Sequence, residues 1–403
     1  MISVTMFPAK NGDCFLISFG DDVKKHILID CGYAETYKRY LRKELISIAE
    51  KGEYISLFVL THVDQDHISG AIPFLRENNK RKIIEISEIW HNSYRHLQFT
   101  KVKGGSIDAL EKKVLDEEIA LGSTIIENFE GGTIDSEISI KQGSTLASLI
   151  YEGKYSWNKS FDGKAVSFSV NQFVEVNDMS MCILSPDKDK LNALSKDWLM
   201  HLQSYKYNFN FTDDQIFDDA FEFYMLGKPE FNIVDESISR GTINDLDQYS
   251  KMEQNEIDSS VINGSSIAFY AEYAGKKLLF LADSHPDIIF SNIVELDKLG
   301  LLKDSFDLVK ISHHGSEKNI TSELAHLIPS QKYLISTNGK THGHPDIEAI
   351  ARIITADKKG HLKEFIFNYP TETAIALNNK EWMEKYNYSV TIADGDNPVI
   401  VEL

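Results

Sequence analysis

The sequence predicts a layered α/β fold, and two observations lead to this prediction. Short apolar runs of strand-like composition alternate with stretches of helical length through most of the chain. Polar residues suited to acid–base or ligand chemistry come directly after several of these apolar runs. Because the strands of a layered α/β protein present their ends along one edge of a sheet, we expect these polar residues to meet there.

The N-terminal part is predicted to begin with two short strands joined by a tight turn. Residues 14–19 and 26–30 are apolar, and Gly20-Asp21-Asp22 between them has the composition of a turn. The pattern then predicts a helix, a buried strand and a second helix. Pro73 is compatible with the start of that second helix. These three elements cover about residues 36–51, 55–60 and 68–75.

The middle of the chain is less regular, and regular alternation resumes after Asn263. Residues 95–180 mix helical and strand-like pieces, and a strand at 181–184 ends in Ser185-Pro186-Asp187. Beyond Asn263 the pattern predicts a strand hairpin, a helix, two strands separated by a helix, and a final helix. The hairpin strands lie at 266–271 and 277–281, and the first helix lies at about 286–299. The two later strands lie at 307–311 and 332–336, and the final helix begins at about 346.

We predict one domain over residues 1–403, with residues 188–260 as an insertion or lid between its two halves. This segment is polar and rich in Asp, Asn, Tyr and Phe, and it interrupts the alternation of strands and helices. A surface excursion without a role in substrate binding is the alternative.

Composition restricts the class of protein. In 403 residues no apolar run is long enough to cross a bilayer, and the N-terminus lacks the pattern of a signal peptide. Cys14, Cys31 and Cys182 are too few and too scattered for a disulfide framework or a thiolate zinc site. We therefore predict a soluble, cytoplasmic protein without a membrane segment; its oligomeric state stays open.

The net charge of −19 limits the way in which the protein could bind nucleic acid. A surface that binds by broad neutralisation of phosphates usually carries basic patches, so the charge argues against such a surface. It does not exclude a metal-centred nuclease, because bound cations can attract phosphate within an acidic protein.

The segment Thr61-His62-Val63-Asp64-Gln65-Asp66-His67 is the strongest local signal in the sequence. It follows the apolar run 55–60, so four potential metal ligands lie where a buried strand ends. Imidazole and carboxylate are ligands that divalent ions of intermediate hardness prefer. A solvated acidic turn that contains two histidines by chance is the alternative, but similar residues recur further along the chain.

Four other predicted strands also end in residues suited to metal chemistry. The first of these ends at Asp30 and another at Ala282-Asp283. The next is followed by Ser312-His313-His314-Gly315-Ser316, and the last by Thr341-His342-Gly343-His344-Pro345. Five strand ends of this kind predict a single site at one edge of the sheet.

Taken together, these segments resemble the metallo-β-lactamase superfamily. The HxDxDH, HHGS and GHP forms are similar to the hydrolase domain of the competence protein ComEC and its stand-alone relatives. The motifs occur in the order of that family and span residues 11 to 345. They are Asn11-Gly12-Asp13, Leu28-Ile29-Asp30-Cys31-Gly32, Thr61 to His67, Leu281-Ala282-Asp283, Ser312 to Ser316 and Gly343-His344-Pro345.

The resemblance implies an αββα sandwich with two divalent metal ions at one edge. Carried over residue by residue, it assigns His62 and Asp64 to one metal. It assigns Asp66 and His67 to the other. Asp283 would bridge the two ions, and His313 would complete the second position, a role for which His314 is the alternative.

The resemblance also implies roles around the metal ligands. Asp30, and with it Asp13, would hold the ligand loop by hydrogen bonds. Asp66 is a candidate acceptor for the proton of the attacking water, with Asp283 as the alternative. His314 and His344 would face the substrate and protonate the leaving group.

Two departures from the family pattern concern the first metal position. Most of the superfamily has His where this chain has Asp64, so the first position is richer in oxygen. Zinc is expected first, and the oxygen ligands make manganese or magnesium alternatives. The family also supplies a His after the strand at 181–184, where this chain has Asp187 and no His. Asp187 is a weak candidate for a replacement ligand, and His91 is a candidate for the edge of the site.

The implied reaction is metal-assisted hydrolysis, and phosphodiesters are the first candidate substrates because the ComEC-type domain is a presumed nuclease. Nucleic acid or a nucleotide would then be the substrate. A small-molecule esterase or lactonase suits the acidic composition better. A binding protein that has lost turnover and an effector activated by a partner protein are further alternatives.

Overall fold

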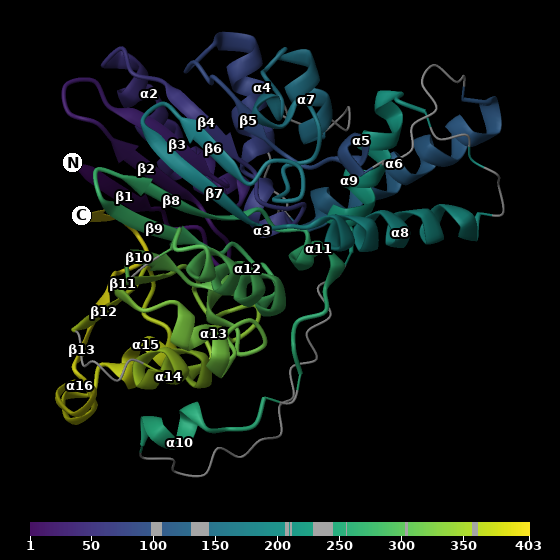
Figure 1. Ribbon diagram of the computed structural model, residues 1–403. Helices are drawn as coiled ribbons and strands as arrows, with labels where there is room; N and C mark the ends of the chain where they lie inside the picture. The colour runs from purple at the N-terminus through teal and green to yellow at the C-terminus, as the bar shows by residue number, and fades with distance from the viewer. Residues whose placement is uncertain are drawn as a thin grey trace.

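In the computed structural model, two β-sheets lie face to face and helices cover their outer faces (Figure 1). The elements and contacts below are those of the residues that the structure describes. These are residues 1–97, 107–129, 145–205, 209, 212–228, 245–254, 256–302, 305–356 and 362–403, without the side chains of 122–129.

The first sheet has six strands in the order β14-β1-β2-β3-β4-β5. Strands β1, β2 and β3 pair antiparallel, whereas β3, β4 and β5 run parallel. β14 joins the outer edge of β1, so the C-terminal strand returns to the sheet of the N-terminal half. The strands are β1 (Ile2–Met6), β2 (Phe15–Phe19), β3 (Lys25–Ile29), β4 (Ile55–Val59), β5 (Ile89–Trp90) and β14 (Val399–Glu402).

The second sheet has eight strands in the order β13-β12-β11-β10-β9-β8-β7-β6. Strands β6 to β9 form an antiparallel meander, and β9 to β13 run parallel. The strands are β6 (Phe173–Val176), β7 (Met179–Ser185), β8 (Ala268–Tyr273), β9 (Lys276–Phe280), β10 (Phe306–Lys310), β11 (Ser330–Ile335), β12 (Lys363–Phe367) and β13 (Tyr388–Ile392).

Two groups of helices form the outer layers. Those of the N-terminal half and the middle of the chain are α1 (Ala34–Thr36), the π-helix η1 (Tyr37–Leu41), α2 (Arg42–Glu50), α3 (Gln65–Ile68), α4 (Ala71–Arg81), α5 (Tyr94–Leu97), α6 (Ala109–Phe129), α7 (Leu146–Glu152), η2 (Lys159–Phe161), α8 (Lys188–Ser204), α9 (Gln215–Leu226), α10 (Leu246–Ser250) and α11 (Val261–Gly264). Those of the C-terminal half are α12 (Pro286–Lys298), the 3-10 turn η3 (Ser312–Gly315), α13 (Ser322–Leu327), α14 (Ile347–Ala356), α15 (Glu372–Leu377) and α16 (Lys380–Tyr386).

Three buried apolar layers hold the sandwich together. The layer between the sheets contains residues from both, among them Phe15 and Phe280, whose rings meet edge to face with centroids 5.7 Å apart. A second layer packs the N-terminal helices against the outer face of the first sheet. A third packs α12, α13 and α14 against the second sheet. The observed architecture is therefore the αββα sandwich that the family resemblance implied.

The described part of residues 188–260 contains α8, α9 and α10. Helices α8 and α9 pack against α5, α6, α7 and α11, to one side of the sandwich, as Figure 1 shows. α10 instead packs against α14 of the C-terminal half. The role of this segment as a lid stays a prediction. Within the described ranges, no helix is both long and apolar enough to span a membrane.

Candidate metal centre

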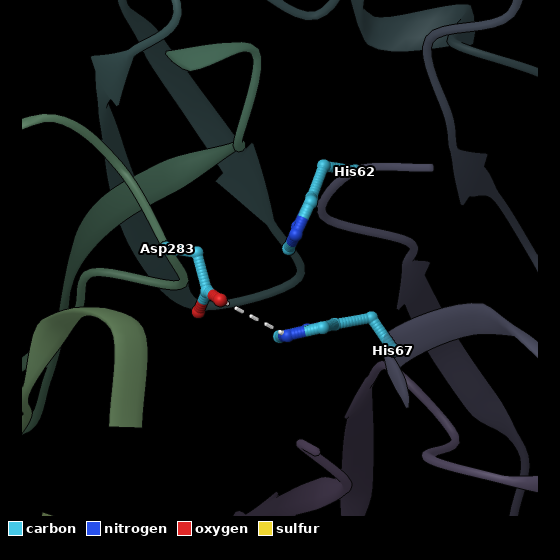
Figure 2. A group of neighbouring side chains, drawn as sticks. All are labelled: His62, His67 and Asp283. Atoms are coloured by element: carbon cyan, nitrogen blue, oxygen red, sulfur yellow. Dashed lines mark ion pairs between the residues drawn. The ribbon is translucent and has the colours of Figure 1, made fainter. Parts of the chain in front are cut away.

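The predicted ligands converge at an edge between the two sheets. His62 and Asp64 follow β4, and Asp66 and His67 lie in the short helix α3. Asp283 follows β9 in the second sheet. Figure 2 shows His62 and His67 on one side and Asp283 opposite them, with an ion pair between His67 and Asp283.

Asp66, His67, Asp283 and His314 form a compact cluster of donor atoms. Asp283 Oδ2 lies 3.4 Å from His67 Nε2 and 3.4 Å from His314 Nε2. Asp66 Oδ2 lies 3.5 Å from His314 Nε2, and Asp66 Oδ1 lies 3.9 Å from His67 Nε2. Ligand bonds of about 2.0–2.1 Å in a tetrahedral site give donor–donor spacings of roughly 3.4 Å. The donors that lie mutually close form groups of three, Asp66 with His67 and His314, and His62 with His67 and Asp283, and each group has spacings that suit a divalent ion.

Hydrogen bonds to Nδ1 orient three of the histidines and leave Nε2 of each ring to the donor cluster. His67 Nδ1 is 2.8 Å from Asp30 Oδ2, and His314 Nδ1 is 2.8 Å from the carbonyl oxygen of Ser336. His62 Nδ1 is 3.0 Å from Thr61 Oγ1, whose own proton goes to Asp30. Each Nδ1 therefore carries a proton, and in the neutral ring Nε2 keeps a free lone pair.

Buried polar atoms without a partner support a metal at this place. The Nε2 atoms of His62, His67 and His314 and Oδ1 of Asp283 are buried and make no hydrogen bond among the described residues. A buried polar atom without a partner costs free energy, so a native structure normally satisfies it. Divalent ions would satisfy these nitrogens, since His67 belongs to one donor group with His62 and Asp283 and to another with Asp66 and His314.

Asp30 holds the ligand loop, the segment from His62 to His67, by hydrogen bonds. Its carboxylate accepts hydrogen bonds from the backbone N–H of Thr61 at 2.8 Å and from Thr61 Oγ1 at 2.7 Å, in addition to His67 Nδ1. The side chain is fully buried. Asp30 thereby fixes both the start and the end of the segment from His62 to His67.

The Asn11-Gly12 turn also contacts the ligand loop. Asn11 Nδ2 donates to Asp66 Oδ2 at 3.0 Å, and Asn11 Oδ1 accepts from Tyr33 Oη at 3.0 Å. A Cβ atom on Gly12 would lie 1.8 Å from the carbonyl oxygen of Asp66, so only glycine fits there. The sequence prediction quoted this motif but gave Asn11 no role.

A buried lysine completes the charge arrangement. Lys310, at the end of β10, pairs with Asp13 through its Nζ and lies 3.7 Å from Asp283 Oδ1. It also donates to the carbonyl oxygen of Ala282 at 3.2 Å. Asp283 therefore presents Oδ2 to the histidines and Oδ1 to Lys310. The sequence prediction missed Lys310, and its signal was a charged residue inside an otherwise apolar run just before Ser312.

The electrostatics of the cluster favour a bound cation. Burial lowers the pKa of His62 to about 4, which keeps this ring neutral. For His67 and His314 burial opposes the charged form, but the attraction of Asp283 and neighbouring carboxylates outweighs it and raises the pKa of both rings well above the usual value. The carboxylates thus attract positive charge, and a metal ion would displace these protons.

The backbone at this edge adopts a conformation that non-glycine residues rarely take. Asp30, Ala282, His313 and His314 have φ values of 52°, 47°, 44° and 55°. Positive φ costs free energy for residues with a Cβ atom and often occurs at functional sites. In the turn after β10, the positive φ values of His313 and His314 direct their two imidazoles in different directions.

The first metal position is poorer in donors than the second. His62 Nε2 lies 3.6 Å from Asp64 Oδ2. Among the described residues, the groups of three or more closely spaced donors include His62 with His67 and Asp283, but none includes Asp64. Asp187 is used in another way, because its side chain accepts from Lys190 N and caps α8.

His313 and His314, the two alternatives for one ligand position, lie differently relative to the donor groups. His314 belongs to the compact donor groups, whereas His313 belongs to none of those found within the described residues. His313 Nε2 lies 3.8 Å from Asp283 Oδ2, and its side chain is 9% exposed, compared with 2% for His314. His314 therefore lies among the closely spaced donors and His313 at their edge, and the roles of both as ligand or substrate-facing residue stay predictions.

Two further candidate residues lie at different distances from this cluster. The ring centroid of His344 is 5.4 Å from that of His313, and His344 Nδ1 is 3.1 Å from Asp346 Oδ2. His91 is fully buried with Nε2 2.7 Å from Glu222 Oε1. His91 therefore links β5 to α9, and it is absent from the donor groups of the described residues.

Part of the chain matches a family of known proteins. Residues 8–149 match the family model described as the metallo-beta-lactamase superfamily. The chain is also similar to the metallo-beta-lactamase fold protein YhfI from Bacillus subtilis, at 11% identity, a TM-score of 0.38 and 100% coverage of both chains. No curated protein sequence matches the chain. The αββα sandwich, together with the family match over residues 8–149, is that of a metallo-β-lactamase fold.

Proposed function

We propose that this protein is a metal-dependent phosphodiesterase, with nucleic acid or a nucleotide as its substrate. The close spacing of Asp66, His67, Asp283 and His314 is the observation that supports a hydrolytic metal site. The carboxylate-rich donor set and the ComEC-like motifs favour phosphodiesters as the substrate class. Carboxylate oxygens are ligands that manganese and magnesium accept alongside zinc.

In this proposal the metal positions are unequal. Asp66, His67, Asp283 and His314 would hold one divalent ion tightly, and His62 with Asp64 would hold a second one more weakly. Bound ions would supply hydroxide near neutral pH and neutralise charge on the phosphate oxygens. Zinc is the first candidate, with manganese and magnesium as alternatives.

The protein's own side chains provide orientation and proton transfer. The oxygen of a water molecule attacks phosphorus and the bond to the leaving oxygen breaks. The proton of the water passes to a cluster carboxylate, for which Asp66 is the candidate. His313 and His344 lie beside the cluster and are placed to protonate the leaving oxygen. Asn11 holds the carboxylate of Asp66 in position by a hydrogen bond, and Asp30 holds the imidazole of His67.

A substrate panel with defined metals tests the proposal. Purified protein is stripped of metal and reloaded with zinc, manganese or magnesium, and then assayed on bis-p-nitrophenyl phosphate, single- and double-stranded nucleic acid and cyclic nucleotides. We expect metal-dependent cleavage that Asp283→Asn abolishes and that His326→Ala, at an exposed position, leaves unchanged. Metal-loaded protein that leaves every phosphodiester intact would contradict the proposal.

The net charge favours a second candidate, a small-molecule esterase or lactonase. A formal charge of −19 repels polyanions but does not affect neutral esters. The same metal-loaded samples are therefore assayed on p-nitrophenyl acetate and simple lactones. Hydrolysis of these compounds without cleavage of bis-p-nitrophenyl phosphate would assign the protein to the second class. Activity that appears only with an added partner protein would instead indicate a latent effector.

A further inference from the structure

Asp258 is a buried carboxylate beside the metal centre that the sequence prediction did not single out. It lies near the end of the segment 188–260, and its side chain is 7% exposed. Its Oδ2 accepts from Asn263 Nδ2 at 2.9 Å and from Asn319 Nδ2 at 2.9 Å, and it is 3.5 Å from His313 Nδ1. Asp258 therefore connects the end of this segment to the loop that follows His313.

The contacts of Asn319 determine which way its amide points. Its Nδ2 faces three acceptors, namely Asp258 Oδ2 and the carbonyl oxygens of Asp283 at 3.3 Å and Ser284 at 3.2 Å. An amide oxygen in that place would face oxygen atoms only, so the amide has one acceptable orientation. Asn319 Oδ1 is thereby left to accept from His313 Nδ1, at 2.9 Å.

This hydrogen bond determines the tautomer of His313. Because Asn319 Oδ1 can only accept, the proton of the neutral ring lies on His313 Nδ1. His313 Nε2, 3.8 Å from Asp283 Oδ2, is then the nitrogen that carries the lone pair in the neutral ring and the transferable proton in the charged ring. The chain of contacts from Asp258 through Asn319 thus decides which ring nitrogen of His313 faces the cluster.

A second histidine near Asp258 does not compete for this role. His285 Nε2 is 3.7 Å from Asp258 Oδ1, but it makes its hydrogen bond to the carbonyl oxygen of Ser260, at 2.8 Å. His285 Nδ1 accepts from Lys190 Nζ at 2.9 Å. Both nitrogens of His285 are therefore occupied, and the polar path from Asp258 into the site leads through Asn319.

The surrounding backbone keeps Asp258 in this place. Asp258 N donates to the carbonyl oxygen of Lys318 at 3.3 Å, and Gln254 Nε2 donates to that of Glu317 at 2.7 Å. Lys318 Nζ pairs with Glu256 at 2.9 Å. Several contacts thus bind the end of the segment to the loop between His313 and Asn319.

We infer that Asp258 is a positioning residue for His313, the substrate-facing histidine of the proposed hydrolase. The inference rests on the proposed function for its catalytic consequence. Its structural part, the fixed tautomer of His313, is independent of the substrate. Loss of an orienting partner of this kind typically costs about 10–100-fold in activity.

A double-mutant cycle on the full-length, metal-loaded protein tests the catalytic part. We expect Asp258→Ala to lower kcat by about 10–100-fold with little change in KM. His313→Ala should remove the contribution of His313, and the double variant should then be no slower than His313→Ala alone. Asp287→Ala removes a carboxylate that pairs with Lys190 on the outer side of His285 and serves as the matched control. Additive losses in the double variant would overturn the inference.

Two readouts do not depend on turnover. Nitrogen-15 spectra of the histidine rings should show His313 as the Nδ1–H tautomer, with its signals identified by their absence from His313→Ala. The same signals in Asp258→Ala should shift toward a tautomer mixture, whereas Asp287→Ala should retain the native pattern. The affinity for manganese or zinc should stay within about threefold in Asp258→Ala, well below the 10–100-fold loss typical of a disturbed ligand.

These readouts separate the two proposals. If no phosphodiester or ester is cleaved but the tautomer of His313 depends on Asp258, the proposed function fails and the positioning role stands. If the wild-type protein is active and Asp258→Ala leaves both kcat and the tautomer unchanged, the positioning role fails alone. A large loss of metal affinity in Asp258→Ala would show that Asp258 acts on the ligands, and this outcome too would overturn the inference.

Discussion

His313 and His314 are adjacent in sequence but have different surroundings. The positive φ values of both residues turn the two imidazoles apart. His314 Nδ1 donates a hydrogen bond to the carbonyl oxygen of Ser336, and His313 Nδ1 donates one to Oδ1 of Asn319. His314 is thereby directed into the donor group and His313 to its edge.

Metal binding by single variants distinguishes the two residues. We expect His314→Ala to lose affinity for zinc or manganese by more than the roughly 10–100-fold that removal of an orienting partner costs, because a direct donor is removed. His313→Ala should bind metal almost as tightly as the wild type. Calorimetric titration of the metal-free proteins measures both. Equal losses in the two variants would show that His313 is also a ligand.

Gly12 shows how closely the N-terminal turn approaches the ligand loop. In Gly12→Ala the new methyl group would collide with the backbone of Asp66, so we expect lower thermal stability together with weaker metal binding. Gly52→Ala is the control, because nothing lies within 4 Å of its Cβ position. Its φ of +76° should cost about 1–2 kcal/mol of stability without changing metal affinity. Thermal melts and metal titrations of both variants test this, and unchanged metal affinity in Gly12→Ala would contradict it.

At the scale of elements, α9 carries two buried acidic residues outside the metal centre, Asp218 and Glu222. Asp218 pairs with Arg95 of α5, and Glu222 pairs with His91 at the end of β5. Asp219 Oδ1 accepts from Thr145 Oγ1 at 2.5 Å, at the start of α7. These polar contacts join α9 to the first sheet and to α7, so this helix is attached by charge pairs as well as by its apolar face.

Asp219 should make the stability of the protein depend on pH. Burial raises its pKa to about 7, so between about pH 4 and pH 7 the folded state binds more protons than the unfolded state. Its contribution to stability is therefore lost as pH rises through this window. Asp219→Asn should match the wild type near pH 4 and exceed it above pH 7 by on the order of a few kcal/mol.

Chemical denaturation across this pH range measures the difference. Asp116→Asn, at an exposed position on α6, controls for the loss of a surface charge. The expectation is wrong if the stability advantage of Asp219→Asn is constant from pH 4 to pH 8.

Several strands and the helix α12 were predicted within a residue or two, because an apolar pattern bounded by turns determines them locally. The predicted runs 55–60, 307–311 and 286–299 correspond to β4, β10 and α12. Strand β1 and the edge strands β13 and β14 were not predicted. Their mixed burial gives no continuous apolar run, and β14 finds its partner β1 only after the chain has returned from the second sheet.

At the scale of the whole molecule, the metal centre connects the two sheets. His62 and His67 come from the loop after β4 of the first sheet, and Asp283 and His314 follow β9 and β10 of the second. A bound ion would therefore link the two halves of the sandwich. The repulsion among the buried carboxylates would also be relieved.

Metal should accordingly stabilise the folded protein. At free metal about a hundredfold above Kd the stabilisation is about 2.7 kcal/mol, and removal of metal by a chelator should reverse it. In Asp283→Asn we expect this metal-dependent increment to be lost while the metal-free protein remains folded. Asp394→Asn, in an exposed loop, should retain the full increment. Scanning calorimetry with and without metal checks this, and an unchanged increment in Asp283→Asn would remove Asp283 from the site.

By itself the sequence determined the layered α/β class and named the residues that meet at the sheet edge, since ligand-type residues followed successive strands in a recognisable order. Only the tertiary structure decided how they act on one another. It placed His314 rather than His313 in the donor group, made Asp187 a helix cap, and brought Lys310, Asn319 and Asp258 to the site. The physical reason is that tautomers, side-chain directions and charge pairs depend on neighbours distant in sequence, which local patterns do not specify.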